Sequence, residues 1–159
     1  MKFRELIRKK KALPREDCIR ILQEEKRGVL SVLGDGGYPY GTPVNHYYDA
    51  AENVLWFHCG RIGHRLDALR ACDKASFCCV SGGESVEGSW ALRFRSAVAF
   101  GRVEIVDDHD KMVDITTKLT RKFTDDEDFL RRELEQFGKA TLLLALHVEH
   151  LSGKAITEE

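Results

Sequence analysis

Short apolar runs rich in β-branched and aromatic residues recur along this chain, and turn sequences rather than helices join most of them. Strands joined by hairpins form antiparallel sheets, whereas regular alternation with helices builds parallel ones. The pattern predicts an α+β fold, an antiparallel six-stranded barrel with flanking helices, rather than a doubly wound sheet. The predicted strands cover residues 28–33, 38–48, 54–59, 74–81, 90–108 and 139–151, and the predicted helices 14–27, 60–73, 109–123 and 125–137.

Size and charge narrow the class of protein. A length of 159 residues with 43% apolar residues suits a single domain, residues 1–159. A formal net charge of -1 predicts no nucleic-acid partner and no membrane partner. The chain shows no membrane-spanning run and no signal peptide, and its five cysteines include no C-x-x-C pair, so we expect a cytoplasmic protein without disulfides. His147 and His150 point to opposite faces of a strand, so no metal site is predicted.

The second predicted strand carries two prolines. Pro39 and Pro43 cannot donate to a sheet ladder, which places this strand at an edge, at a bulge, or where something other than a strand lies against it. Two interpretations of the segment 42–48 stay open. It is an edge strand with surface tyrosines, or its main-chain groups meet a planar heterocycle whose rim alternates hydrogen-bond donors and acceptors.

The segment 58–65, His-Cys-Gly-Arg-Ile-Gly-His-Arg, combines glycines with two arginines where a strand is predicted to feed a helix. The first N–H groups of a helix and its positive dipole end attract anions, so Arg61 and Arg65 fit a phosphate. The alternative is a solvated basic turn that pairs with Asp67 or Asp73. Ile62, Leu66 and Leu69 are predicted to form the buried stripe of this helix.

A third candidate lies in the long strand, where Arg95 shares a face with Arg93 and Ser96 lies on the other face. A charged exposed face explains both arginines, and the alternative is that Arg95 and Ser96 reach a ligand or a partner subunit. No G-x-G-x-x-G follows a strand, and no nucleophile motif is present. Any chemistry is therefore expected to come from a cofactor.

In their order, the segments 28–49, 54–80, 90–108 and 144–156 resemble the FMN-binding split-barrel proteins related to pyridoxamine 5'-phosphate oxidase, especially the nitroimidazole-resistance branch. The resemblance covers about residues 14 to 156. It implies a split barrel and a homodimer with FMN at the subunit interface, each FMN touched by both chains.

The resemblance also implies a set of cofactor contacts. The Pro-Val-Asn stretch would line the isoalloxazine ring, the histidine and cysteine at the strand end would lie beside the flavin, and the arginine at the helix start would hold the phosphate. The implied residues are Pro43, Val44, Asn45, His58, Cys59, His64, Arg65, Arg95 and Ser96.

The function implied is an oxidoreductase in which NADH or NADPH reduces FMN and the flavin reduces a small acceptor such as a 5-nitroimidazole. His58 is the candidate proton donor, and its alternative role is a hydrogen bond to the FMN phosphate or the backbone. The final segment lacks the arginine-rich tail of the oxidases that act on vitamin B6, which argues against that substrate. The alternatives are a protein that stores or senses flavin without turnover, and a barrel that binds a deazaflavin or a haem held by His46, His64 or His150.

Overall fold

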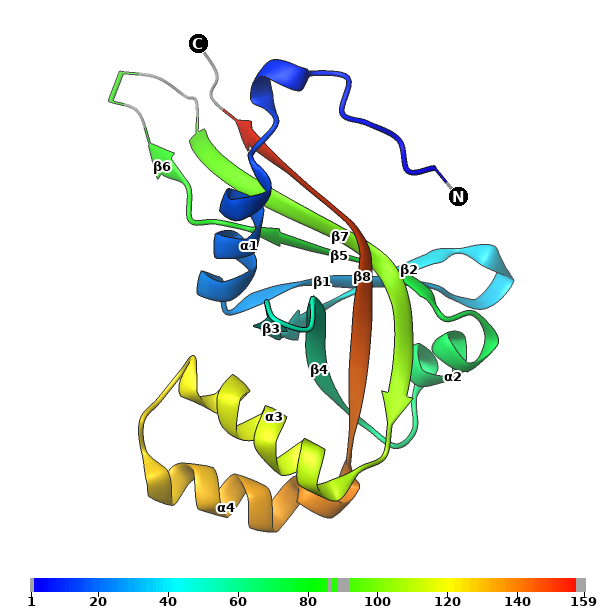
Figure 1. The fold of residues 1–159 in the computed structure, drawn as a ribbon. Helices are drawn as coiled ribbons and strands as arrows, with labels where there is room; N and C mark the ends of the chain where they lie inside the picture. Colours follow the sequence, from blue (N-terminus) through cyan, green and yellow to red (C-terminus); the bar gives the residue numbers. More distant parts are fainter. Residues whose placement is uncertain (1, 86, 89–91, 157–159) are drawn as a thin grey trace.

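A single strongly curved antiparallel sheet organises the computed structural model, which describes residues 2–85, 87–88 and 92–156 (Figure 1). The strands pair in the order β2-β1-β5-β7-β8-β4-β3, and β6 pairs with β7 beside this path. The strands are β1 (Arg27–Leu33), β2 (Pro39–Asn45), β3 (Tyr47–Asp49), β4 (Val54–Gly60), β5 (Lys74–Val80), β6 (Glu84–Ser85), β7 (Leu92–Val106) and β8 (Thr141–Ile156).

Four α-helices flank the sheet in the described part of the chain: α1 (Arg15–Glu24), α2 (His64–Ala71), α3 (His109–Arg121) and α4 (Glu127–Phe137). Short 3-10 turns lie at Lys9–Lys11, Asp35–Gly37 and Gly138–Ala140. The predicted α+β class and antiparallel pairing are confirmed, and so are the four predicted helices. No helix among the residues described is long and apolar enough to cross a bilayer.

The predicted count of six strands is too low, because eight strands are described. The run 38–48 is broken at His46 into β2 and β3. Residues 84–85, for which no strand is predicted, form the short β6. The last strand continues past Gly153 because β7 stays paired with it as far as Ile156. Of the long strand predicted over 90–108, Trp90 and Ala91 lie outside the described residues.

The break at His46 is fixed by buried polar contacts. His46 is fully buried, and its Nε2 donates to the carbonyl oxygen of Leu22 at 2.7 Å. Lys122, just after α3, donates from Nζ to the carbonyl oxygens of His46 at 3.2 Å and Glu25 at 2.5 Å. Burial lowers the pKa of His46 to about 4, and the nearby Lys122 charge acts in the same direction. The neutral His46 side chain therefore ties β2 to α1, and the His46 backbone carbonyl ties it to Lys122 after α3.

The main core lies inside the curve of the sheet, where α1 and α2 pack. Helix α1 inserts Cys18, Ile21 and Leu22. It approaches β8 so closely that a Cβ on Gly153 would lie 2.4 Å from the Cys18 sulfur. Helix α2 adds Leu66 and Leu69 to the same core. The inner face of the sheet is thus filled by side chains.

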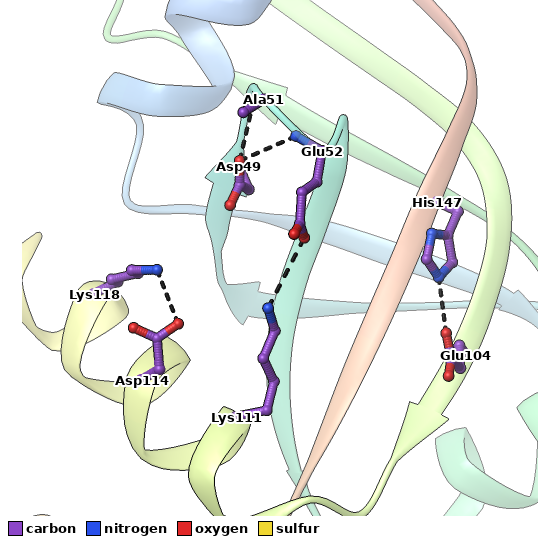
Figure 2. Close-up of polar contacts among 8 residues, drawn as sticks. All are labelled: Asp49, Ala51, Glu52, Glu104, Lys111, Asp114, Lys118 and His147. Atoms are coloured by element: carbon purple, nitrogen blue, oxygen red, sulfur yellow. Dashed lines mark hydrogen bonds and ion pairs between the residues drawn. The ribbon is translucent and has the colours of Figure 1, made fainter.

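Helices α3 and α4 cover the other face of β4 and β8 and form a second core around Trp56, Met112 and Ile115. Their starts are capped by Asp108 and Asp126, which accept from N–H groups three residues later. Figure 2 shows the polar contacts of α3: Lys118 pairs with Asp114, and Lys111 reaches Glu52 of the β3–β4 turn at 3.9 Å. The Lys111 ammonium also lies 4.9 Å from the Trp56 ring centroid. On the neighbouring strands, His147 of β8 pairs with Glu104 of β7 at 3.0 Å (Figure 2).

Candidate functional site

A half-buried arginine at the start of α2 contacts the edge strand β2. Arg65 donates to the Thr42 hydroxyl oxygen from Nε at 3.1 Å and from Nη2 at 2.5 Å. Within the described residues Arg65 forms no ion pair with a carboxylate. We call Thr42, Arg65 and the helix start at Gly63 the arginine site. Its positive charge is not neutralised by the chain itself.

The helix start adds further attraction for an anion. Gly63 stands at the N-cap with φ of 135°, a conformation that side chains rarely adopt, and it offers no side chain to cap α2. The first N–H groups of a helix have no acceptor within the helix, and the dipole places partial positive charge there. Asp67, the acidic residue of the first turn, pairs with Arg70 at 3.1 Å. A phosphate fits this arrangement.

The second arginine of the same turn is used differently. Arg61 forms a bidentate ion pair with Asp107, with distances of 2.7 Å and 2.6 Å, and donates from Nε to the Lys139 carbonyl at 3.0 Å. It pairs with neither Asp67 nor Asp73. Arg61 thus ties the β4–α2 turn to the segments that flank α3 and α4.

The predicted buried stripe is wrong at Ile62, which is 90% exposed. Helix α2 begins only at His64, so Ile62 lies in the preceding turn and does not share the helical face of Leu66 and Leu69. The helical spacing predicted from Ile62 to Leu69 therefore fails at Ile62, because this residue is not part of the helix.

His64 turns away from Arg65 toward the β1–β2 turn. Its ring stacks on Tyr40 at a centroid distance of 4.2 Å. Its Nε2 accepts from the Asp35 backbone N–H at 3.3 Å and lies 3.6 Å from the Asp35 carboxylate. His64 therefore borders the arginine site and holds the turn beside it.

The Pro-Val-Asn segment lies on β2, which pairs only with β1 and forms one end of the sheet, as its prolines predict. Pro43 lies exposed beside Val29, whereas the Val44 side chain is buried in the main core. The Asn45 side-chain oxygen accepts from Arg27 Nε at 2.9 Å. The free main-chain edge of β2 is thus open beside the arginine site.

His58 and Cys59 lie at the end of β4 and point to opposite faces of the strand. Cys59 packs against the main core, where burial raises the pKa of its thiol. His58 lines a cavity of about 380 Å³ between β4 and the helices α3 and α4. This helix cavity is lined by His58, Cys59, Gly60, Met112, Thr116, Thr120, Glu133, Leu134, Gly138, Ala140 and Thr141.

The electrostatics of the helix cavity centre on two groups. Partial desolvation by the cavity walls lowers the pKa of His58, although its side chain stays exposed at the surface. The Glu133 carboxylate opposes this effect and the Arg65 charge adds to it. Alternate residues of β4 face α2 in the main core and α3 in the second core, so the arginine site and the helix cavity lie on opposite faces of this strand.

The structure separates Arg95 from Arg65. Two strands, β1 and β5, stand between β2 and β7 in the sheet. Arg95 lines another cavity of about 480 Å³ with Asp17 and Arg20 of α1. Ser96 lies on the outer face of the sheet, opposite Val80.

The histidines named for the haem alternative are engaged elsewhere. His46 is fully buried and bonded to Leu22, and the His150 ring stacks on Phe3 at a centroid distance of 4.8 Å. Across residues 2–85, 87–88 and 92–156, no group of three or more His, Cys, Asp or Glu side chains is placed to hold a metal ion.

Sequence reasoning missed two residues of these sites, Thr42 and Glu133. Thr42 precedes the proline of the edge strand, and this neighbouring motif is the signal that could have pointed to it. Glu133 stands among the many charged residues of an amphipathic helix, and only the packing of α4 against β4 brings it near His58.

A family model described as pyridoxamine 5'-phosphate oxidase matches residues 14–155. The chain belongs to this family. The resemblance seen in the sequence is thereby confirmed, and the curved antiparallel sheet fits the split barrel expected for a pyridoxamine 5'-phosphate oxidase family member. A search of curated proteins gave no match.

Solved structures of similar fold include flavin-binding proteins. A candidate 5-nitroimidazole antibiotic resistance protein from Bacteroides thetaiotaomicron is 18% identical, with a TM-score of 0.75 over 91% of this chain and 86% of that one. A FAD-binding protein from Mesorhizobium loti is 19% identical, with a TM-score of 0.65 over 92% and 97%. A FAD and heme binding protein from Mycobacterium smegmatis is 22% identical, with a TM-score of 0.66 over 91% and 72%. At these identities the likeness establishes the fold alone.

Proposed function

We propose that this member of the pyridoxamine 5'-phosphate oxidase family is an FMN-binding oxidoreductase that uses NADH or NADPH to reduce a small acceptor of the nitroimidazole class. The observation that carries the proposal is the arginine site. Arg65 is a half-buried guanidinium with no carboxylate partner in the described chain, and it stands at an uncapped helix start beside an open strand edge. The name of the Bacteroides relative supports the acceptor class.

The residues present fit a flavin mononucleotide. Arg65, the Thr42 hydroxyl and the first N–H groups of α2 would hold the phosphate. The ring would lie along the β2 edge, where Pro43 and Asn45 and the main chain of Val44 are accessible to it. FMN, when bound, supplies transfer of a hydride or of single electrons. The chain itself binds and orients the cofactor and excludes water.

His58 is the group proposed to move a proton. It lies at the end of β4 and lines the helix cavity, while Cys59 beside it packs against the main core on the other face of the strand. In its protonated form His58 can donate a proton to an oxygen of the acceptor as that oxygen gains electrons.

A second copy of the chain completes the proposed site. The outer face of β1, β5 and β7 exposes apolar side chains: Val29 is 40% exposed, Val80 49% and Phe100 38%. Exposed apolar patches of this kind mark interaction surfaces. We propose a homodimer on this face with FMN at the interface, in which Ser96 and Arg95 serve the flavin of the partner. A cytoplasmic location is part of the same proposal.

The visible absorption spectrum of the purified protein, repeated after addition of FMN and desalting, tests this function. We expect flavin bands at about one flavin per chain, followed by anaerobic oxidation of NADH or NADPH when a nitroimidazole is supplied. Extraction and chromatography of the bound flavin distinguish FMN from FAD. A protein that retains no flavin contradicts the proposal, and a flavin-loaded protein without turnover is a storage or sensing protein.

A further inference from the structure

The N-terminal segment 2–13, which we call the arm, crosses the outer face of β7 and β8 and is fixed to β8 at both ends. At its start the Phe3 ring stacks on the His150 ring at a centroid distance of 4.8 Å. At its end the Leu13 N–H donates to the Gly153 carbonyl oxygen at 3.0 Å. A cavity of about 450 Å³, which we call the arm cavity, lies between the middle of the arm and the two strands.

The floor of the arm cavity is apolar. Val98 and Phe100 of β7 line it from the sheet, and Leu6 lines it from the arm. Phe100 is still 38% exposed, although the Phe3 ring packs on it at a centroid distance of 5.8 Å. Because β7 stands between β5 and β8, Phe100 lies at the margin between this cavity and the face proposed for the homodimer. The volume suits a small molecule with an apolar part.

The charged lining of the arm cavity is mostly positive. Arg4 and Arg8 of the arm and Lys154 of β8 line it, and within residues 2–85, 87–88 and 92–156 none of the three forms an ion pair. Glu5 also lines the cavity, but its carboxylate pairs with Lys9 at 3.1 Å. Arginine and lysine side chains donate hydrogen bonds and accept none. The cavity therefore combines an apolar floor with donors that suit an anion.

We propose that the arm cavity binds an amphipathic carboxylate, a small molecule that carries one carboxylate group on an apolar chain. The chain would lie on Val98 and Phe100, where it covers apolar surface. The carboxylate would accept hydrogen bonds from the arginines of the arm and from Lys154. Because the arm covers the apolar floor, the cavity suits a single molecule better than a membrane surface. The inference concerns a site apart from the arginine site and does not depend on flavin.

The test compares octanoate with 1-octanol, which has the same number of carbon atoms and no charge. Dissociation constants are measured by calorimetry on the purified full-length protein at low ionic strength. We expect octanoate to bind about tenfold more tightly than 1-octanol, since a hydrogen bond to a charged group contributes about that much. High salt should reduce this preference, because Arg4 and Arg8 are exposed and salt screens exposed charges.

Variants separate the head group from the chain. Arg4→Ala and Lys154→Ala should each reduce the preference for octanoate several-fold, and the double variant should remove it. Lys10→Ala is the matched control, because it removes the same charge from the arm at a position that does not line the cavity. Val98→Thr keeps the shape of the side chain and adds a hydroxyl, so it should weaken binding of both probes by similar factors.

Four outcomes would overturn the proposal. They are no binding of octanoate, equal affinities for the two probes in wild type, a preference that survives in the double variant, and an equal loss in Lys10→Ala. Circular dichroism checks that each variant folds, and Lys154→Gln is a second variant without the charge. Sedimentation with vesicles that contain phosphatidylglycerol tests the membrane alternative. Binding to these vesicles without binding of octanoate would assign the arm to a membrane surface instead.

Discussion

The arginine site and the helix cavity lie on opposite sides of the end of β4, and they carry opposite charges. Among residues 2–85, 87–88 and 92–156, the Arg65 guanidinium of the arginine site has no carboxylate partner, and the Glu133 carboxylate of the helix cavity has no cation partner. Arg61, between them, is neutralised by Asp107. The difference indicates that the arginine site suits an anion, whereas the helix cavity, with Glu133 in its wall, does not.

The comparison predicts that flavin binding and turnover can be lost separately. His58→Gln should lower the rate of acceptor reduction by about 100-fold, the low end for general acid catalysis, while flavin bands remain. A proton donor must be protonated, and the pKa of His58 is lowered, so the wild-type rate should rise as pH falls below about 6.5. Stopped-flow measurements give the rate as a function of pH. If the rate of His58→Gln rises at low pH as the wild-type rate does, His58 is not the proton donor and has a structural role.

The arginine side should show the reverse pattern. We expect Arg65→Ala to weaken FMN binding by about 1.5–3 kcal/mol, the range for hydrogen bonds to a charged group. Arg61→Ala is the matched control from the same turn and should leave FMN affinity unchanged, because its guanidinium is held by Asp107. Fluorescence titration of the apoproteins compares the two. Equal losses of FMN affinity in both variants would contradict a direct contact between Arg65 and the phosphate, and would indicate that either substitution disturbs the β4–α2 turn.

Strand β2 meets α1 and the end of α3 at His46, and acid should loosen that junction. The folded-state pKa of about 4 lies below the usual value of about 6.5. Protons bind first to the unfolded chain, so stability present above pH 6.5 is lost as pH falls toward 4. At pH 5 the stability lost relative to neutral pH is about 2 kcal/mol. Urea unfolding at pH 7 and pH 5 should show a smaller difference in His46→Gln than in wild type. His109→Gln, at an exposed position, should match wild type.

The smallest effect is expected at Thr42. Thr42→Val removes the hydroxyl that contacts Arg65 and should weaken FMN binding by about 0.5–1.5 kcal/mol, the net value of a single hydrogen bond. Thr42→Ser keeps the hydroxyl and should bind FMN nearly as well as wild type. The same fluorescence titration measures both variants. A stronger loss in Thr42→Ser than in Thr42→Val would contradict a role of the hydroxyl.

Local sequence patterns predicted the parts of the fold that depend on neighbours in the chain. The prolines limited β2 to an edge, a bulge or a place where no strand lies against it, and the strand lies at an edge. Alternation placed Arg95 and Ser96 on opposite faces. Contacts between distant segments were beyond these patterns. The break at His46 depends on Lys122, which lies 76 residues further along the chain. The pairing of Arg61 with Asp107 and the approach of Glu133 to His58 likewise arise only when α3 and α4 pack on β4.

The most direct test of the phosphate site is a pair of titrations of the apoprotein with FMN and with riboflavin, which lacks the phosphate. Quenching of flavin fluorescence gives both dissociation constants. We expect FMN to bind at least about tenfold more tightly than riboflavin in wild type, and Arg65→Ala to reduce this difference in affinity. Equal affinities for FMN and riboflavin in wild type would contradict the phosphate site at Arg65.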